Sequence, residues 1–256
     1  MAAIALQYIA PQDQTEELCL EAVQQDWRLL EFVAEQTPAI CLAAVGQNPR
    51  ALEFVEPELQ TEELCLAAVR KDCRLLQFVA EKTEAICLAA VQQNPRALQY
   101  VEAERQTPAV CTAAVRQWAC SYQYVRPTQR TPELAALAVQ ADARLLEFVP
   151  VEQRTPELCM SAVQQDGIAL KWVPVELQTP ALCMAAVRQA GSALQYVANQ
   201  TEELCLAAIA QNPYAFYWVR EQTEAICIAA LLADTWLPWA RVHVRTPAVL
   251  AAAGWA

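Results

Sequence analysis

The sequence has only four glycines and a single histidine among its 256 residues, and these two shortages exclude common kinds of catalytic site. So few glycines leave no glycine-rich loop that would cradle a phosphate group. The histidine, His243, is far along the chain from every serine, so no imidazole base stands beside a serine nucleophile. The serines are Ser121, Ser161 and Ser192. We therefore expect no enzyme activity and no catalytic residues.

Positive charge is also scarce, because 18 Lys and Arg residues stand against 29 Asp and Glu residues, for a net charge of -11. Nucleic-acid-binding domains usually carry a basic patch, so this balance argues against a nucleic-acid partner and favours a protein partner. No apolar run approaches the roughly 20 residues of a membrane helix, which predicts no membrane insertion. The N-terminal segment MAAIALQYIAP lacks the basic start of a signal peptide.

Instead of these features, the sequence contains one unit that starts at a threonine and recurs every 22 to 24 residues. A fixed period of this size is typical of a solenoid. One copy, Thr83–Val101, reads TEAICLAAVQQNPRALQYV. The repeat threonines are Thr15, Thr37, Thr61, Thr83, Thr107, Thr131, Thr155, Thr179, Thr201, Thr223 and Thr246.

Each repeat threonine begins a helical pattern. Its hydroxyl can accept a free backbone N–H at the start of a helix, and the Pro or Glu that follows suits the first turn. Apolar residues three, four, seven and eight positions later share one helical face. In the copy quoted above, these residues are Ile86, Cys87, Ala90 and Val91. An Asp or Asn at position eleven predicts a second N-cap before a short second helix, with a single 3₁₀ turn as the alternative.

These patterns predict an all-α fold in one repeat array that spans residues 1–256. We expect a right-handed α-solenoid of about ten helix-turn-helix repeats of 22–24 residues, with half repeats at both ends. A half repeat covers residues 1–14, full repeats cover residues 15–245, and a terminal first helix covers residues 246–256.

The two half repeats carry apolar residues that have no neighbouring repeat in the sequence pattern. Exposed apolar patches usually mark contacts, so we expect end-to-end self-association or docking on another chain. The residues concerned are Leu6, Tyr8, Ile9, Val249, Leu250 and Trp255.

Nine of the eleven cysteines occupy the fourth position after a repeat threonine, on the apolar face of the first helix. Stacked helices lie about 8–10 Å apart, whereas a disulfide needs Cα atoms about 4.4–6.8 Å apart. We therefore expect this row to be buried, reduced and metal-free, in a cytoplasmic or similar reducing compartment. We predict no cofactor and no other metal site. The row consists of Cys19, Cys41, Cys65, Cys87, Cys111, Cys159, Cys183, Cys205 and Cys227.

Position thirteen after the threonine carries a candidate partner-binding strip, because it is arginine in five of the first six repeats and aromatic in two later ones. One interpretation is surface pairing with a glutamate three residues on, at Glu31, Glu53 or Glu147. The other is a ligand-facing row, because arginine suits bidentate capture of the carboxylates of an acidic, extended protein segment. The strip consists of Arg28, Arg50, Arg74, Arg96, Arg144, Tyr214 and Trp236.

Two further polar patterns have structural interpretations. Glutamate pairs such as Glu62 and Glu63 fall in the first turn of helices, where the helix dipole explains them without acid–base catalysis. Glutamine at position ten is either solvated or forms a hydrogen-bonding ladder between repeats. This glutamine row consists of Gln25, Gln47, Gln93, Gln117, Gln165, Gln189 and Gln211.

The repeat motif T-[PE]-x-[LI]-C-x-x-A-V-x-x-[ND]-x-x-x-L-x-[FYW]-V resembles the repeat family known as domain of unknown function 4116. Copies such as Thr155–Gln178 look closest to it, and the resemblance extends from Thr15 to the region of Arg245. The resemblance implies tandem helical repeats, sometimes beside effector-like domains. It supplies no catalytic residues to transfer to this sequence.

These observations together predict a non-enzymatic protein-binding or scaffold solenoid of unknown specific role, which would use the extended surface that stacked repeats create. The alternative is a structural subunit or fragment of a larger enzyme or effector assembly, which half repeats at both ends would suit.

Overall fold

The structure is a computed structural model, and it describes residues 6–233 and 242–254. Every regular element in these residues is a helix, which confirms the all-α prediction. In most repeats an α-helix of ten residues is followed by a 3₁₀ helix of six residues. The chain forms two compact units, Met1–Gln129 and Arg130–Ala256.

The first unit repeats this pair of helices along its described residues. The α-helices are α1 (Glu16–Gln25), α2 (Pro38–Gln47), α3 (Glu62–Lys71), α4 (Glu84–Gln93) and α5 (Pro108–Gln117). The 3₁₀ helices that follow them are η3 (Trp27–Phe32), η4 (Pro49–Phe54), η6 (Cys73–Phe78), η7 (Pro95–Tyr100) and η9 (Ala119–Tyr124). Shorter 3₁₀ turns are η1 (Leu6–Tyr8), η2 (Pro11–Asp13), η5 (Pro57–Leu59), η8 (Ala103–Arg105) and η10 (Pro127–Gln129).

The second unit is built in the same way. Its α-helices are α6 (Pro132–Ala141), α7 (Pro156–Gln165), α8 (Pro180–Gln189), α9 (Glu202–Gln211), α10 (Glu224–Ala233) and α11 (Pro247–Ala252). Its 3₁₀ helices are η11 (Ala143–Phe148), η13 (Gly167–Trp172), η15 (Gly191–Tyr196) and η16 (Pro213–Trp218), with shorter turns η12 (Val151–Gln153) and η14 (Val175–Leu177). Across the described residues of both units, no helix has the length and apolar character needed to cross a membrane.

The threonine caps predicted from the sequence are present in every repeat. Each hydroxyl oxygen accepts a hydrogen bond from the backbone N–H three residues on, as Thr61 does from Leu64 at 3.3 Å. This bond satisfies one of the free N–H groups at the start of each α-helix.

Wherever the structure describes it, the second element of a repeat is a 3₁₀ helix, the alternative that the sequence left open, and not the second α-helix of a helix-turn-helix repeat. Asp26 ends α1 in an extended conformation, and its carboxylate accepts a hydrogen bond from the N–H of Arg28 at 3.0 Å. The helix then closes with bonds that span three residues, such as that from the N–H of Val33 to the carbonyl of Leu30 at 3.2 Å. In so short a segment, this tighter pattern satisfies more backbone groups than α-helical bonds would.

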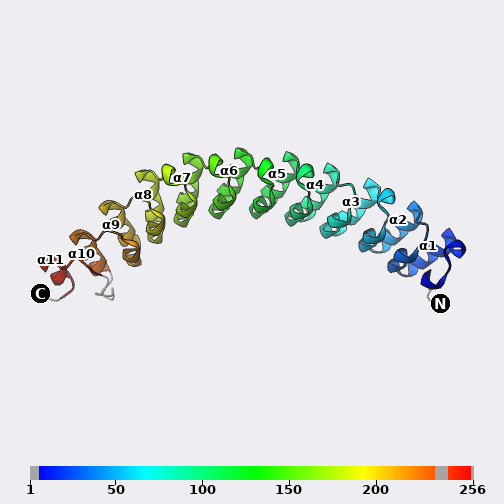
Figure 1. The fold of residues 1–256 in the computed structure, drawn as a ribbon, viewed down its shortest axis with the longest axis horizontal. Coiled ribbons are helices and arrows are strands. Elements are labelled where there is room, and N and C mark those ends of the chain that lie inside the picture. Colours follow the sequence, from blue (N-terminus) through cyan, green and yellow to red (C-terminus); the bar gives the residue numbers. More distant parts are fainter. Residues whose placement is uncertain (1–5, 234–241, 255–256) are drawn as a thin grey trace. The chain divides into compact units, whose positions relative to one another are not determined.

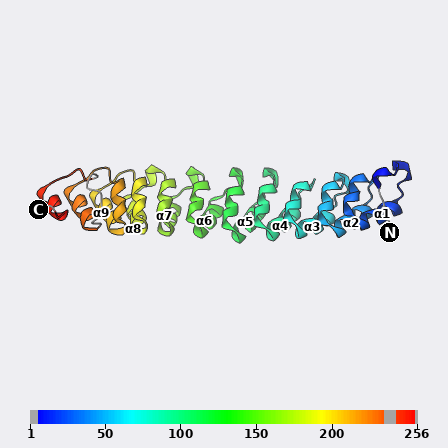
Figure 2. The same ribbon diagram turned by 90° about the horizontal axis from the view of Figure 1, so that it is seen from below.

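The core of each unit is a stack of small side chains. Cys87, Ala90 and Val91 of α4 are fully buried, as is Leu98 of η7. Within each unit, every α-helix contacts the next one in chain order, and the six-residue 3₁₀ helices do the same. Figures 1 and 2 show this succession of elements in chain order within each unit. The alanines allow the close approach of neighbouring helices that this stacking requires.

Two of the apolar residues that we expected at exposed ends are buried instead. Leu6 and Val249 are both 0 % exposed, because η1 contacts η3 and α11 contacts α10. Each half repeat therefore covers its apolar side chain with a neighbouring element of the same unit. Tyr8 is 82 % exposed and Leu250 is half-buried, while Trp255 lies outside the described residues. The expectation of end-to-end self-association thus loses two of the side chains on which it rested.

Gly167 lies where successive repeats approach too closely for a side chain, because a Cβ there would be 2.3 Å from the carbonyl oxygen of Ala186. We expect Gly167→Ala to lower the free energy of unfolding by about 1–3 kcal/mol, since the backbone has to move apart. In the control Gly46→Ala, the added Cβ meets no atom within 4 Å. Helix propensity there predicts a gain of up to about 1 kcal/mol. Denaturant unfolding measures both changes, and equal stability of the two variants would contradict the expectation.

Candidate functional site

A glutamine immediately before the repeat threonine joins successive repeats. Gln106, only 1 % exposed, donates from Nε2 to the carbonyl oxygens of Val101 at 3.2 Å and Tyr124 at 3.1 Å. Its Oε1 accepts a hydrogen bond from the N–H of Arg126 at 2.8 Å. One side chain thus satisfies three backbone groups at the ends of η7 and η9. The residues that bond in this way, here called the clasp glutamines, are Gln14, Gln36, Gln60, Gln106, Gln178 and Gln200.

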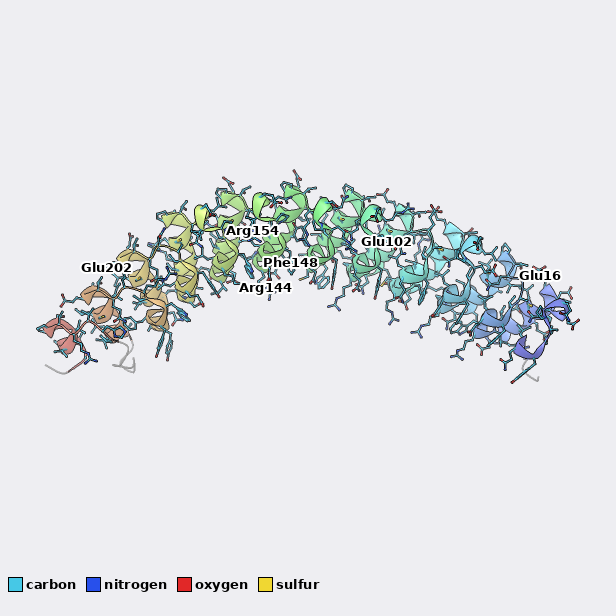
Figure 3. All side chains as sticks on the ribbon, in the orientation of Figure 1. Glu16, Glu102, Arg144, Phe148, Arg154 and Glu202 are labelled. Carbon is cyan, nitrogen blue, oxygen red and sulfur yellow. The ribbon has the colours of Figure 1, made fainter. Side chains whose placement is uncertain are left out.

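In some repeats a cation replaces the clasp glutamine. Lys82, 8 % exposed, forms an ion pair with Glu102 at 2.6 Å. Arg154 donates from Nε to the carbonyl oxygen of Val149 at 2.9 Å. Figure 3 shows Arg154 away from the lower edge of the second unit, where Arg144 lies. Arg154 also donates from Nη1 to the carbonyl oxygen of Trp172 in the next repeat, so both cations are occupied in joining the repeats.

The cysteine row lies against the clasp glutamines. The Sγ of Cys111 donates to Oε1 of Gln106 at 4.0 Å, and the Sγ of Cys41 donates to Oε1 of Gln36 at 3.5 Å. All eleven cysteines are free thiols. Burial raises the pKa of five of them to about 11: Cys41, Cys65, Cys87, Cys111 and Cys159. A raised pKa opposes formation of the thiolate, which is the form that attacks a substrate or binds a metal.

Glutamines at position ten form a second ladder, as one of the two sequence interpretations proposed. Gln47 donates from Nε2 to the carbonyl oxygen of Gln24 at 2.6 Å, and its Oε1 accepts from the N–H of Trp27 at 2.7 Å. Gln189 likewise accepts from the N–H of Gly167 at 2.6 Å. In both cases the glutamine bonds to backbone groups of the preceding repeat, as Gln117, Gln165 and Gln211 also do. Gln25 bonds instead to Glu21 of its own helix, and Gln93 is exposed.

The 3₁₀ helices leave positions thirteen and sixteen facing solvent in the first four repeats and in the repeats of Arg144 and Tyr214, whereas Cys120, Ile168 and Ser192 at position thirteen are half-buried. With three residues per turn, these two positions lie one above the other, on the side away from the buried leucine at position fifteen. Arg144 and Tyr214 are exposed at position thirteen in the second unit, and Trp236 lies outside the described residues. In the first unit four exposed residues, here called the arginine edge, occupy this position: Arg28, Arg50, Arg74 and Arg96.

Arginines that follow an aspartate cap are held by that aspartate, two residues earlier, instead of by the expected glutamate three residues later. Arg74 bonds to Asp72 through Nε at 2.9 Å and Nη2 at 2.8 Å, and Arg144 bonds to Asp142 through the same two atoms. The hydrogen bond from the arginine side chain lowers the pKa of Asp72 and of Asp142. Arg28 lies farther from Asp26, with 3.8 Å between Nη1 and Oδ2.

Arginines that follow an asparagine cap have no such partner. Among the residues that the structure describes, no carboxylate lies within ion-pair distance of Arg50 or Arg96. The guanidinium of Arg96 lies 4.9 Å from the ring centre of Trp118, which occupies the capping position of the next repeat. Arg50 lines a groove of about 210 Å³ together with Arg74 and Phe78. The described part of the first unit thus presents two arginines that form no ion pair, although Glu53 and Asp72 line the same groove as Arg50.

Position thirteen becomes aromatic late in the second unit. Tyr214 is 58 % exposed, and its ring stacks on that of Tyr217 with 6.3 Å between ring centres. The candidate strip is therefore cationic in the first unit, whereas in the second unit it changes from the paired Arg144 to the aromatic Tyr214.

The part of the chain that contains Arg50 and Arg96 also matches a known family. Residues 38–84 and 61–106 each match the model described as "Domain of unknown function (DUF4116)". This segment carries DUF4116 repeats. The match confirms the family that the repeat motif suggested, over a segment that extends from α2 to η8. No curated protein and no solved structure matches the chain. Because the family description names no function, a functional proposal has to rest on the surface itself.

Replacement of Gln106 tests the clasp. Gln106→Met leaves three backbone groups without a partner in a buried site, so we expect the free energy of unfolding to fall by about 2–4 kcal/mol. The control Lys82→Gln installs the residue that other repeats use at this position, and we expect a change of less than about 1 kcal/mol. Denaturant unfolding of both variants measures the effect. A Gln106→Met protein as stable as the wild type would show that the clasp is dispensable.

The raised pKa of the buried thiols predicts a loss of stability at alkaline pH. The folded chain holds these protons more tightly than the unfolded chain, so their contribution is complete below the ordinary pKa of 9.0 and is lost as the pH rises through about 11. We expect thiolate absorbance to appear near pH 11 in the native protein and near pH 9 in denaturant. Thiolate absorbance at the same pH in both states would contradict this prediction.

Proposed function

We propose that this chain is a non-enzymatic protein-binding or scaffold protein, built as a single right-handed array of repeats of 22–24 residues. The observation that carries the proposal is the arginine edge, where four exposed arginines occupy the same position in successive repeats of an otherwise acidic chain. The proposed partner is an acidic, extended segment of another protein, because guanidinium groups form strong paired hydrogen bonds with carboxylates.

The other regular rows of the chain have structural roles, and this contrast supports the proposal. Threonine caps the α-helices, both glutamine rows join neighbouring repeats, and the cysteines are buried beneath the clasp glutamines. The arginine side chains, by contrast, extend from the 3₁₀ helices into solvent, with Arg28 and Arg74 exposed by 71 % and 63 %. The arginine edge makes one such contact between repeats in the described part of the first unit, that of Arg96 with Trp118, and this contact leaves the guanidinium without a carboxylate partner.

Charge and thiol chemistry narrow the proposal further. A net charge of -11 repels a polyanion over most of the surface, so a short acidic protein segment fits better than nucleic acid. The buried free thiols fit a reducing compartment such as the cytoplasm.

Neutralising the arginine edge tests the proposed function. We expect its replacement by glutamine to weaken binding of the acidic partner about tenfold or more and to flatten the salt dependence, because paired charges are lost. The edge variant changes Arg28, Arg50, Arg74 and Arg96 to Gln. A matched control with the same net charge changes the exposed residues Arg70, Arg105, Arg116 and Arg126 to Gln.

The measurement has two stages. Affinity capture with the wild-type chain and mass spectrometry first identify binding proteins, and titration at two salt concentrations then compares the variants with each purified partner. The proposal requires that the control binds like the wild type while the edge variant does not. If the edge variant keeps the wild-type affinity and salt dependence, the arginine edge is not the binding surface.

A further inference from the structure

We infer that the arginine edge recognises carboxylates spaced at two-repeat intervals, because the two of its arginines that follow an asparagine cap form no ion pair within the described part of the chain. This inference rests on the proposed protein-binding function and specifies its ligand. The two anchoring residues are Arg50 and Arg96, which stand one repeat on either side of Arg74.

The cap residue controls the charge of the edge without changing the fold. Asn48 accepts a hydrogen bond from the N–H of Arg50 at 3.0 Å, and Asp72 accepts one from the N–H of Arg74 at the same distance. Both residues therefore cap a 3₁₀ helix equally well. Only the aspartate also binds the guanidinium of the following arginine, through two of its nitrogen atoms. The choice between Asp and Asn thus decides whether the arginine is neutralised.

The surroundings of Arg96 make it the stronger anchor. Its cap is the neutral Asn94, and the residue three positions on is the neutral Gln99. The ring of Trp118 lies 4.9 Å from its guanidinium and orients it through a cation–π contact. Glu53 lines the same groove as Arg50, and its negative charge repels an acidic ligand. A carboxylate bound at Arg50 is therefore repelled more strongly by neighbouring charge than a carboxylate bound at Arg96.

The repeat spacing sets the spacing of the ligand. Neighbouring helices lie about 8–10 Å apart, so Arg50 and Arg96 are separated by roughly 16–20 Å over two repeats. An extended chain advances about 3.3 Å per residue, so carboxylates about five or six residues apart reach both arginines. A segment with adjacent carboxylates reaches only one of them at a time.

Substitution of the caps tests the inference without removing any arginine. In the double variant Asn48→Asp with Asn94→Asp, each new carboxylate keeps the cap and neutralises its own arginine. The control Gln24→Glu with Gln92→Glu adds the same charge at two exposed positions of α1 and α4. Thermal melts establish that both variants are folded.

The probe is a fluorescently labelled synthetic peptide of glycine, serine and two aspartates, and its binding is followed by fluorescence anisotropy. One form has the aspartates about six residues apart, and a second form of the same composition has them adjacent. We expect the spaced peptide to bind the wild type and the charge control at least about fivefold more tightly than it binds the cap variant. Asp72→Asn releases Arg74, one repeat from each anchor, and should increase the affinity for a third form of the peptide, whose aspartates are about three residues apart.

Several outcomes would overturn the inference. Equal binding of both peptides would show that the chain does not distinguish the spacing of the two carboxylates. The proposed protein-binding function would still stand if binding of a captured partner depends on the arginine edge. Equal binding by the cap variant and the charge control would show that the caps do not regulate the arginines. If a single-stranded oligonucleotide binds more tightly than the spaced peptide, the ligand is a nucleic acid and not an acidic protein segment. Absence of binding by either peptide would also reject the inference.

Discussion

Hydrogen bonding at helix ends is the constraint on which the rest of this structure depends. Every helix end leaves backbone N–H or C=O groups without a partner, and two short helices in each repeat multiply such ends. Side chains supply most of the missing partners: threonine caps the α-helices, Asp or Asn caps all the described six-residue 3₁₀ helices except those that follow Trp118 and Ala190, and the clasp glutamines bind the 3₁₀ ends. Gln106 alone bonds to three backbone groups. Because these bonds connect one repeat to the next, they also hold the small-residue core together.

The same constraint shapes the candidate binding surface. A cap needs only a side-chain oxygen, so Asp and Asn both satisfy it. The fold accepts either a charged or a neutral cap, and this choice decides whether the next arginine forms an ion pair. Asp72 pairs with Arg74, whereas Asn94 supplies no carboxylate to Arg96. Stability and recognition are therefore set by different atoms of one position in the repeat. An acidic chain can in this way present a few available cations at defined intervals.

Interactions between residues close in the sequence were the ones that could be predicted. The threonine caps, the buried face of each α-helix and the exposure of Arg50 and Arg96 all follow from local spacing. The pairing of the arginines did not, because the expectation considered only the glutamate three residues on, such as Glu53, and not the side chain that caps the second helix. The actual element is a 3₁₀ helix, in which the capping residue two positions earlier lies within reach of the guanidinium, as Asp72 does for Arg74.

The sequence by itself determined the helical repeats, their caps and the position of the arginine edge, because each depends on hydrogen bonds or apolar contacts within a few residues. Only the tertiary structure decided that Gln106 bonds to Tyr124 and Arg126, eighteen and twenty residues away. It also decided that Leu6 and Val249 are buried, although the pattern offered them no neighbouring repeat. Both results depend on which element packs against which, and a repeat pattern does not specify the atoms that meet when two of its copies stack.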